Sequence, residues 1–427
     1  MKRSVLRLAI GAAPVAAVAL LAGCGGGIGH SSSPGGSSTP ATAQASAATP
    51  FSGNCGTAVP TGSGETFTLN SSVQPQIAVV PGGNLVGVWE QDRWSGLGAR
   101  GIMSAHSGDG GATWSAAQAL PFSACGNGSV GGVVYDRTSD PWISFAGGGV
   151  VYASALAFSA NGYTGGSGFG TTGGLSAVLV SRSADGGATW SAPSAVMTDT
   201  NAASPFFFND KDAVTADPST GNVYIVWDRL TSNTTTGSAP AWIASSTNGG
   251  STWNTRVLYD PGAGNEAFAN QIVILPNGHL LDLFLLISST ISSSSLQVIQ
   301  STDGGSTWST TSPTTVATVT SVGTTNPITN GVIRDASHLP QVAVDPASGN
   351  VAAVWQQSFT SGAFDGIALS TSTNGGATWS AFKQINGASG FAAFDPSVRY
   401  LPSGVIAVTY YDFRDFVSGS SVLTTSA

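Results

Sequence analysis

The chain has 427 residues and only 8% of them are charged, with 14 Lys and Arg against 22 Asp and Glu and a net charge of −8. An acidic chain lacks the basic surface that nucleic-acid binding needs, and a 41% apolar content excludes a wholly disordered protein. With 57 Gly and so few charges for exposed helix faces, the composition favours an all-β protein whose surface is built from Ser, Thr, Asn and Gly.

The N-terminal residues 1–23 have the pattern of a signal peptide. Three basic residues precede an apolar run from Leu8 to Leu21, which is too short to span a bilayer as a mature helix. The run ends in Leu-Ala-Gly followed by Cys24, which resembles a bacterial lipoprotein signal and implies a lipidated Cys24. Residues 24–50 are rich in Gly, Ser, Pro and Ala and predict a flexible tether. We therefore expect an extracytoplasmic envelope protein that contacts the membrane through its lipid alone.

Two further cysteines, Cys55 and Cys125, follow the tether. In an exported protein two cysteines are expected to form a disulfide. It would close a loop of about 70 residues and stabilise the fold by about 4 kcal/mol. The alternative is a pair of buried free thiols.

An eight-residue string recurs five times: SGDGGATW (107–114), SADGGATW (183–190), STNGGSTW (246–253), STDGGSTW (301–308) and STNGGATW (372–379). Each copy follows a short apolar strand. The Asp or Asn offers a side-chain oxygen to the backbone of a turn, the glycines permit positive φ, and the closing Trp can pack between neighbouring sheets. The string predicts a structural turn.

A second pattern, strand–turn–strand, alternates with the first and starts near residues 75, 131, 212, 270, 340 and 395. The most degenerate copy, from Gly131, is interpreted as a hairpin whose turn carries Asp136 and Asp140. A hairpin plus the strands on either side of the eight-residue turn makes four strands for each unit. Six such units predict a six-bladed β-propeller over residues 51–427.

The last unit stops early, with SVLTTS (421–426) as its third strand. The segment TFTLN (66–70) precedes the first unit and has no hairpin partner. We expect this N-terminal strand to supply the missing outer strand of the sixth sheet, since that would close the ring and cover open strand edges.

The five strings resemble the Asp-boxes, or BNR repeats, of the sialidase (neuraminidase) superfamily, whose members are six-bladed propellers. The resemblance implies an arginine triad for the substrate carboxylate, a Tyr/Glu pair as nucleophile and base, and an Asp as acid/base. This chain departs from that pattern: no Arg occurs in residues 73–80, and Glu90-Gln91-Asp92-Arg93 is one residue longer than the family's Glu-x-Arg. Arg93 could take the place of the arginine in the family's Glu-x-Arg, and Asp92 that of its acid/base Asp. Glu266 lies slightly before the position at which the family has its Glu in the fourth blade.

In such a blade the eight-residue turns lie at one end, and the loops after the second and fourth strands lie at the other. Most acidic residues of the chain fall on that second face, which is where propeller ligands commonly bind. The catalytic candidates are Asp92, Asp210, Asp212, Glu266 and Tyr411, because paired carboxylates suit glycoside chemistry. The substrate-binding candidates are Arg93, Lys211, Asp228, Arg229, Asp412 and Arg414.

Each candidate also has a structural interpretation. Neighbouring Asp and Arg at strand ends often form ion pairs that pin loops, and NDKD (209–212) could simply shape the start of a strand. Tyr410 aligns with the Trp that ends other second strands, which indicates packing and leaves Tyr411 as the better candidate. His106, His279 and His338 show no metal-ligand spacing, and no cofactor motif is present.

The leading hypothesis is an envelope-anchored, monomeric, sialidase-like propeller that recognises extracellular glycans, with or without catalysis. One alternative is an active glycoside hydrolase that uses the carboxylates of the loop face. The other is a propeller that binds a protein partner.

Overall fold

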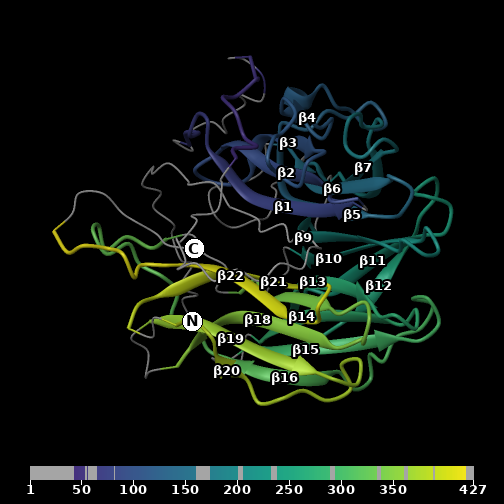
Figure 1. The fold of residues 1–427 in the computed structure, drawn as a ribbon. Coiled ribbons are helices and arrows are strands. Elements are labelled where there is room, and N and C mark those ends of the chain that lie inside the picture. The colour runs from purple at the N-terminus through teal and green to yellow at the C-terminus, as the bar shows by residue number, and fades with distance from the viewer. Residues whose placement is uncertain are drawn as a thin grey trace, which may run out of the picture.

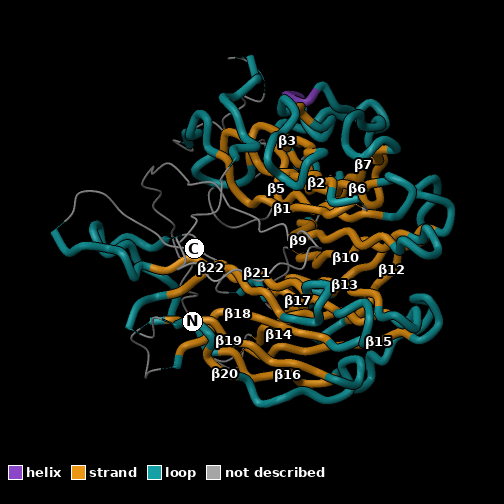
Figure 2. The backbone as a smooth tube through the Cα atoms, viewed as in Figure 1, coloured by secondary structure: helices purple, strands orange, loops and turns teal. Residues whose placement is uncertain are grey.

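A computed structural model describes residues 43–52, 55, 65–80, 82–159, 174–200, 205–231, 238–288, 294–333, 338–359, 364–387 and 390–419. The expected signal peptide, Cys24, most of the tether and the strand expected at 421–426 lie outside these residues. The described part is all-β, with one short 3₁₀ helix, η1 (Ala124–Gly126), and antiparallel strand pairs throughout (Figures 1 and 2). It contains no helix long and apolar enough to span a bilayer.

The strands, in chain order, are β1 (Ser72–Val80), β2 (Asn84–Arg93), β3 (Ala99–Ser107), β4 (Gln118–Ala119), β5 (Arg137–Phe145), β6 (Val151–Phe158), β7 (Ser176–Ser183), β8 (Ser194–Asp199), β9 (Phe207–Ala216), β10 (Val223–Thr231), β11 (Ala241–Ser246), β12 (Asn254–Tyr259), β13 (Asn265–Ile274), β14 (Leu280–Ser288), β15 (Ser294–Ser301), β16 (Thr314–Val319), β17 (Gln341–Val344), β18 (Val351–Ser358), β19 (Asp365–Ser372), β20 (Lys383–Gln384), β21 (Ala393–Tyr400) and β22 (Ile406–Asp412).

These strands form five consecutive groups of four, in which each strand pairs with the next along the chain, followed by the two-stranded sheet β21–β22. The first two groups are joined into one eight-stranded sheet by a single pair, Ala99 with Thr138. The first strands of successive groups contact one another in order: β1 with β5, β5 with β9, β9 with β13, β13 with β17, and β17 with β21. We call these six the inner strands. Figure 1 shows the groups following one another from β1–β8 at the top, through β9–β12, to β15, β16 and β20 at the bottom.

Five inner strands carry a β-bulge with a non-Gly residue at positive φ: Gln74 (52°), Asp140 (51°), Lys211 (51°), Ala269 (57°) and Asp395 (51°). A bulge takes one residue out of the regular ladder of hydrogen bonds. The preceding sheet supplies a partner in three cases: Glu90 Oε1 accepts a hydrogen bond from the Asp140 N–H (3.2 Å), Gln356 Oε1 accepts one from the Asp395 N–H (3.4 Å), and the Asp228 carboxyl accepts one from the backbone of Ala269. These polar side chains therefore connect neighbouring sheets at the bulges.

The eight-residue repeats form the structural turns that the sequence predicts. In the first repeat, Asp109 Oδ1 accepts hydrogen bonds from Ser107 Oγ and the Thr113 N–H, both at 2.8 Å. The Thr113 hydroxyl, which donates to Oδ2 at 2.6 Å, is the main reason that the pKa of Asp109 falls to about 2. Asn248 and Asn374 build the same turn with an amide. The closing Trp residues pack against the apolar cores of the sheets, as expected.

The N-terminal segment does not close the sixth sheet, so that prediction is wrong for the described residues. Phe67 bridges to Trp94, the Thr68 N–H donates to the Arg93 carbonyl (2.9 Å), and the Ser95 N–H donates to the Thr66 carbonyl (2.8 Å). The segment therefore extends along the end of β2 in the first sheet. Because the segment leads directly into β1, which pairs with β2, it continues that hairpin past the end of β1.

In the second unit the first strand and its turn lie further along the chain than the sequence predicts. Its inner strand, β5, contains Asp140, and the following turn is formed by Gly147, Gly148 and Gly149, all at positive φ. Asp140 therefore lies in a bulge of an inner strand and not in the hairpin turn. The glycine turn was overlooked because the segment lacks the Asp-Pro or Pro-Gly turn residues of the other copies.

Asp282 is a fully buried carboxyl group in the middle of β14, paired in register with Ile272 and Ile299. Neither carboxyl oxygen has a well-formed hydrogen bond. Burial raises the pKa of Asp282 well above the usual range, and the backbone of Gln271 opposes this only in part. A carboxyl group in this position is tolerated best in its neutral form.

Replacement of Asp282 by Asn is expected to make the protein more stable at pH 8 by about 1–3 kcal/mol, because the variant has no charge to bury. A raised carboxyl pKa gives stability that is complete below the unfolded pKa and is lost as the pH rises through the folded pKa. The gain should therefore shrink towards zero near pH 4. Urea unfolding of both proteins across this range measures it, and equal pH slopes would contradict the prediction.

Candidate functional site

Lys211, in the bulge of β9, is at the centre of a group of charged side chains. Its Nζ lies 2.8 Å from Asp210 Oδ1 and 3.4 Å from Asp140 Oδ2, and 5.7 Å from the centre of the Phe268 ring. The side chains of Lys211 and Asp210 are 19% and 21% exposed, so a ligand can reach both. The positive φ of Lys211 turns its side chain out of the regular alternation of the strand. The side chain therefore lies between the second, third and fourth groups of strands, which supply Asp140, Asp210 and Phe268.

A second cation, Arg93, stands at the end of β2. Its guanidinium group pairs with Glu90 at 2.5 Å, and Glu90 Oε1 also accepts a hydrogen bond from the Ser139 hydroxyl at 2.8 Å. Burial alone would lower the pKa of Arg93, but Glu90, helped by Asp140 and Asp210, raises it overall. Arg93 therefore remains a permanent cation whose charge is already balanced.

Two fully buried carboxyl groups, Asp212 and Asp228, complete the group. No oxygen of either one makes a hydrogen bond of good geometry. Burial raises both pKa values well above the usual range; a contact with the Ser154 hydroxyl partly offsets this for Asp212. At Asp228 the negative charges of Asp210 and Glu266 raise the pKa further, while the positive charge of Lys211 and a backbone hydrogen bond from Ala269 oppose this in part. Both residues are therefore held towards the neutral form.

We call these residues the Lys211 cluster: Glu90, Arg93, Asp140, Asp210, Lys211, Asp212, Asp228 and Glu266. It unites six residues that the sequence analysis proposed: Arg93, Asp210, Lys211, Asp212, Asp228 and Glu266. The register of β2 with β3 places Glu90 and Arg93 at the end of the first sheet opposite to the turn that carries Asp109. The cluster thus lies on the expected face.

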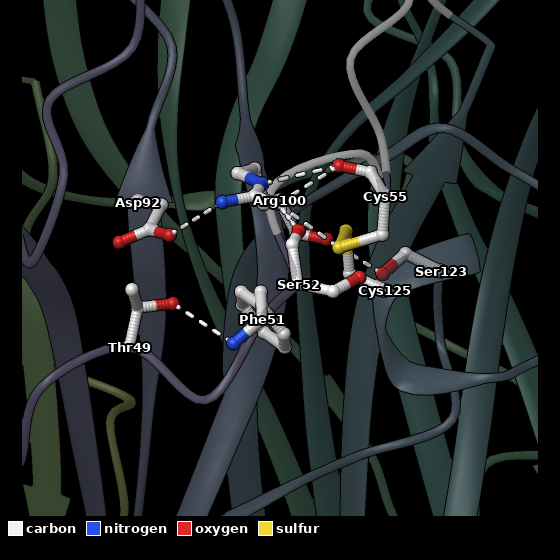
Figure 3. The surroundings of a disulfide bond; sticks show 8 residues. All are labelled: Thr49, Phe51, Ser52, Cys55, Asp92, Arg100, Ser123 and Cys125. Carbon is white, nitrogen blue, oxygen red and sulfur yellow. Dashed lines mark hydrogen bonds and ion pairs between the residues drawn. A yellow bond between two sulfur atoms is a disulfide. The ribbon is translucent and has the colours of Figure 1, made fainter.

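Asp92 lies apart from the cluster, in a buried contact network beside the disulfide (Figure 3). Its Oδ2 pairs with Arg100 Nη1 at 3.1 Å, and both side chains are at most 1% exposed. Arg100 also donates to the carbonyls of Ser52 and Cys55. The predicted disulfide between Cys55 and Cys125 is confirmed, with a sequence separation of 70. Asp92 therefore helps to hold the N-terminal segment against the first sheet.

Arg229 also lies in a contact network of its own. Its guanidinium group pairs with Asp199 and lies 3.7 Å from the centre of the Phe207 ring and 5.1 Å from that of Trp242. This arrangement matches the structural interpretation of neighbouring Asp and Arg as loop-pinning residues, although here the partner of Arg229 is Asp199 and not the adjacent Asp.

The remaining candidates belong to the two-stranded sheet. Tyr411 stacks on Phe394 with 5.9 Å between ring centres, and burial, together with the nearby Asp395, raises its pKa. Arg414 pairs with Asp412 at 2.5 Å and is 38% exposed.

The sequence analysis missed three members of the site: Asp140, Glu90 as a member in its own right, and the ring of Phe268. Asp140 was recoverable, since Asp140-Pro141 repeats the X-Pro pattern of Gln74-Pro75 and Asp395-Pro396 at other inner-strand bulges. The proximity of Phe268 to Lys211 depends on how two sheets pack, which no local pattern encodes.

Other site classes find no support in the part of the chain that the structure describes. It contains no group of three or more His, Cys, Asp or Glu side chains arranged to hold a metal ion. A recess of about 300 Å³, lined by residues that include Tyr152, Arg182 and Asn248, lies beside the third eight-residue turn and holds none of the proposed site residues.

The strands and the order of the antiparallel sheets define the chain as an all-β protein, and its similarity to solved sialidase structures shows a sialidase-like fold. No protein-family model matches the sequence, and no curated protein matches it. The structure is similar to that of the Hadza microbial sialidase Hz136, with a TM-score of 0.55, 16% identity, and coverage of 79% of this chain and 63% of that one.

Two further solved structures are similar at the same level. A protein of unknown function from Dyadobacter fermentans has a TM-score of 0.51 and 13% identity, with 81% of this chain and 93% of that chain covered. The leech intramolecular trans-sialidase has a TM-score of 0.50 and 14% identity, with 80% and 65% covered. This chain thus spans less than two thirds of the two sialidase structures. At these identities the likeness shows the fold.

Proposed function

We propose that residues 51–427 form a six-bladed sialidase-like propeller that recognises extracellular glycans through the Lys211 cluster. The five four-stranded groups and the two-stranded sheet would be its six blades, and the eight-residue turns its Asp-boxes. After removal of the signal peptide (residues 1–23), residues 24–50 would tether it, as a monomer, to the bacterial envelope through a lipid on Cys24. The sialidase-like fold supports this proposal, because solved relatives of that fold are sialidases.

The observation that carries the proposal is the partly exposed pair of Lys211 and Asp210 beside the half-buried ring of Phe268. Charged acceptors and donors form strong hydrogen bonds with sugar hydroxyl groups, and an aromatic ring offers a surface for the apolar face of a sugar. A few convergent polar groups beside an aromatic side chain are typical of ligand-binding sites.

Glycoside hydrolysis is the second candidate, and Asp212 favours it. A buried carboxyl group with a raised pKa can act as the acid, while Asp210 serves as the base or nucleophile, because Lys211 partly offsets the increase that burial causes in the pKa of Asp210. A classical sialidase mechanism would also need arginines that are free to clamp a carboxylate. Five of the described arginines are already paired with acidic side chains: Arg93, Arg100, Arg137, Arg229 and Arg414.

A glycan array with the full-length protein tests the proposal. We expect specific binding, reduced about tenfold or more in an Asp210→Asn variant, because a charged hydrogen-bond partner is worth about 1.5–3 kcal/mol. Asp109→Asn is the matched control, since it makes the same carboxyl-to-amide change in an eight-residue turn, away from the Lys211 cluster. Asn248 builds the equivalent turn of another repeat with an amide.

An assay of the same proteins on fluorogenic glycosides, including a sialoside, distinguishes recognition from hydrolysis. Turnover that Asp210→Asn abolishes would establish the second candidate. A wild-type protein that binds no glycan and hydrolyses none would contradict both.

A further inference from the structure

The recess of about 300 Å³ lies at the boundary between the second and third groups of strands, beside the third eight-residue turn. It holds none of the residues that the sequence analysis proposed, and it is remote from the Lys211 cluster. Along β10, Val223 pairs with Ser246 of the third turn, whereas Asp228 pairs with Asp210 of the cluster. The recess therefore lies at the other end of the sheets, and its volume is at the lower end of the range for small-molecule sites.

At other boundaries, a side chain of one group donates to a backbone carbonyl in the turn of the next group. Gln118 of the first group donates to the Gly187 carbonyl of the second turn at 2.9 Å. Gln300 of the fourth group donates to the Gly375 carbonyl of the fifth turn at 2.7 Å. Arg256 of the third group does the same for the fourth turn. Such a hydrogen bond holds the turn against the preceding sheet.

The third turn receives no such bond from the second group in the part of the chain that the structure describes. Arg182, which lines the recess, occupies the position of Gln300, because each directly precedes the Ser that opens a turn. Every other described arginine pairs with an acidic side chain or donates to a backbone carbonyl. The exposed guanidinium group of Arg182 does neither among the described residues, so its donors are available to a ligand.

Tyr152 provides a second unpartnered donor at the recess. It is equivalent to Tyr224, since each is the second residue of the second strand of its group. The Tyr224 hydroxyl donates to the Gly304 carbonyl of the fourth turn at 3.2 Å. The Tyr152 hydroxyl lies beside Gly249, the equivalent glycine of the third turn, but forms no hydrogen bond with any described residue, although Tyr152 is only 3% exposed. A hydroxyl group in such a place gains free energy from an acceptor that a ligand supplies.

The carboxylates of the neighbouring turns leave the charge of Arg182 unpaired. Asp185 and Asp217 each accept hydrogen bonds from Ser and Thr side chains of their own turns. Neither forms an ion pair with Arg182 among the described residues. The third turn itself carries Asn248 where three other repeats carry Asp, so it adds no negative charge to the recess.

We propose that this recess binds the carboxylate of an acidic sugar, a uronic acid, through Arg182 and Tyr152. The planar guanidinium group can donate to both carboxylate oxygens at once, and the Tyr152 hydroxyl can donate to one of them. The half-buried side chains of Ala146 and Val150 give the sugar ring an apolar wall. Thr247, which is exposed and whose hydroxyl forms no hydrogen bond with the described residues, can bind a sugar hydroxyl group.

Titration of the full-length protein with glucuronate and with glucose, followed by saturation-transfer NMR, tests this proposal. The two sugars differ in whether the sixth carbon is a carboxylate or a hydroxymethyl group. We expect saturable binding of glucuronate, and binding of glucose that is about tenfold or more weaker, because hydrogen bonds between charged groups are the stronger ones. Added salt should weaken the binding of glucuronate, because it screens the attraction.

Arg182→Gln should weaken the binding of glucuronate about tenfold or more. The variant should keep its fold, because Gln300 shows that Gln fits the equivalent position. Arg182→Lys should weaken binding less, since it keeps the charge but loses the planar pair of donors. Tyr152→Phe should weaken it several-fold.

Arg256→Gln is the matched control. It removes the same charge from the neighbouring boundary, where the guanidinium group already donates to the carbonyls of Gly305 and Ser306. Binding of glucuronate should be unchanged in this variant.

Equal binding of glucuronate and glucose, no saturable binding of glucuronate, or unchanged binding in Arg182→Gln would overturn the proposal. Loss of glucuronate binding in Asp210→Asn, but not in Arg182→Gln, would place the sugar in the Lys211 cluster and overturn it as well. Glycan-array binding that depends on Asp210 requires no contribution from the recess. The proposed function can therefore stand where this proposal fails, and the reverse.

Discussion

Replacing Asp92 by Asn is expected to lower the free energy of unfolding by about 3 kcal/mol. The substitution leaves the Arg100 cation 1% exposed with no carboxylate to balance it, and breaking a buried pair by removing one partner is strongly destabilising. Asn is the right replacement because Asp92 has a φ of 59°, a left-handed conformation that Asn tolerates. The change therefore isolates the charge, and urea unfolding at neutral pH measures it.

Asp210→Asn is the matched control for this loss. Asp210 also pairs with a cation, Lys211, but both side chains are partly exposed, at 21% and 19%, so water can solvate the Lys211 ammonium group in the variant, and pairs that water reaches contribute about 0–1 kcal/mol. We expect a correspondingly small change. If Asp92→Asn unfolds like the wild type but abolishes glycoside turnover, Asp92 is a catalytic residue and the structural interpretation is wrong.

Removal of the disulfide by Cys55→Ser with Cys125→Ser is expected to lower the free energy of unfolding by about 4 kcal/mol. The bond closes a loop with a sequence separation of 70, and the loss of chain entropy in the unfolded state predicts a cost of this size. Reduced wild-type protein should show the same loss, whereas reductant should not change the double variant. Two free thiols in the native protein would contradict the prediction.

The loss of stability caused by Asp92→Asn and the loss caused by removal of the disulfide should not be additive. Arg100 Nη2 donates to the Cys55 carbonyl at 3.1 Å, so the disulfide positions one partner of Arg100 and Asp92 provides another. Residues in one network commonly show coupling energies of about 0.5–3 kcal/mol. The variant with all three substitutions should therefore lose less than the sum of the separate losses.

The repeated patterns predicted the local structure well, because each rests on interactions within a few residues. Asp109 and Thr113 hydrogen-bond inside a single turn, and the alternation of apolar residues specifies each hairpin on its own. Where a copy was degenerate the prediction failed: the turn after β5 is made by three glycines, and Asp140 was placed in a turn although it lies in a bulge beside Lys211.

The sequence by itself determined the all-β class, the hairpins, the eight-residue turns and the pairing of Cys55 with Cys125, since local hydrogen-bonding patterns and a count of cysteines were enough for these. Tertiary structure decided which charged residues meet. Two Asp-Arg neighbours look alike in sequence, yet Arg93 pairs with Glu90 of its own strand within the Lys211 cluster, while Arg229 stacks on Phe207 and pairs with Asp199. The pair of Arg229 and Asp199 joins strands of different sheets, β10 and β8, and such partners depend on how the sheets pack and on where each bulge turns a side chain.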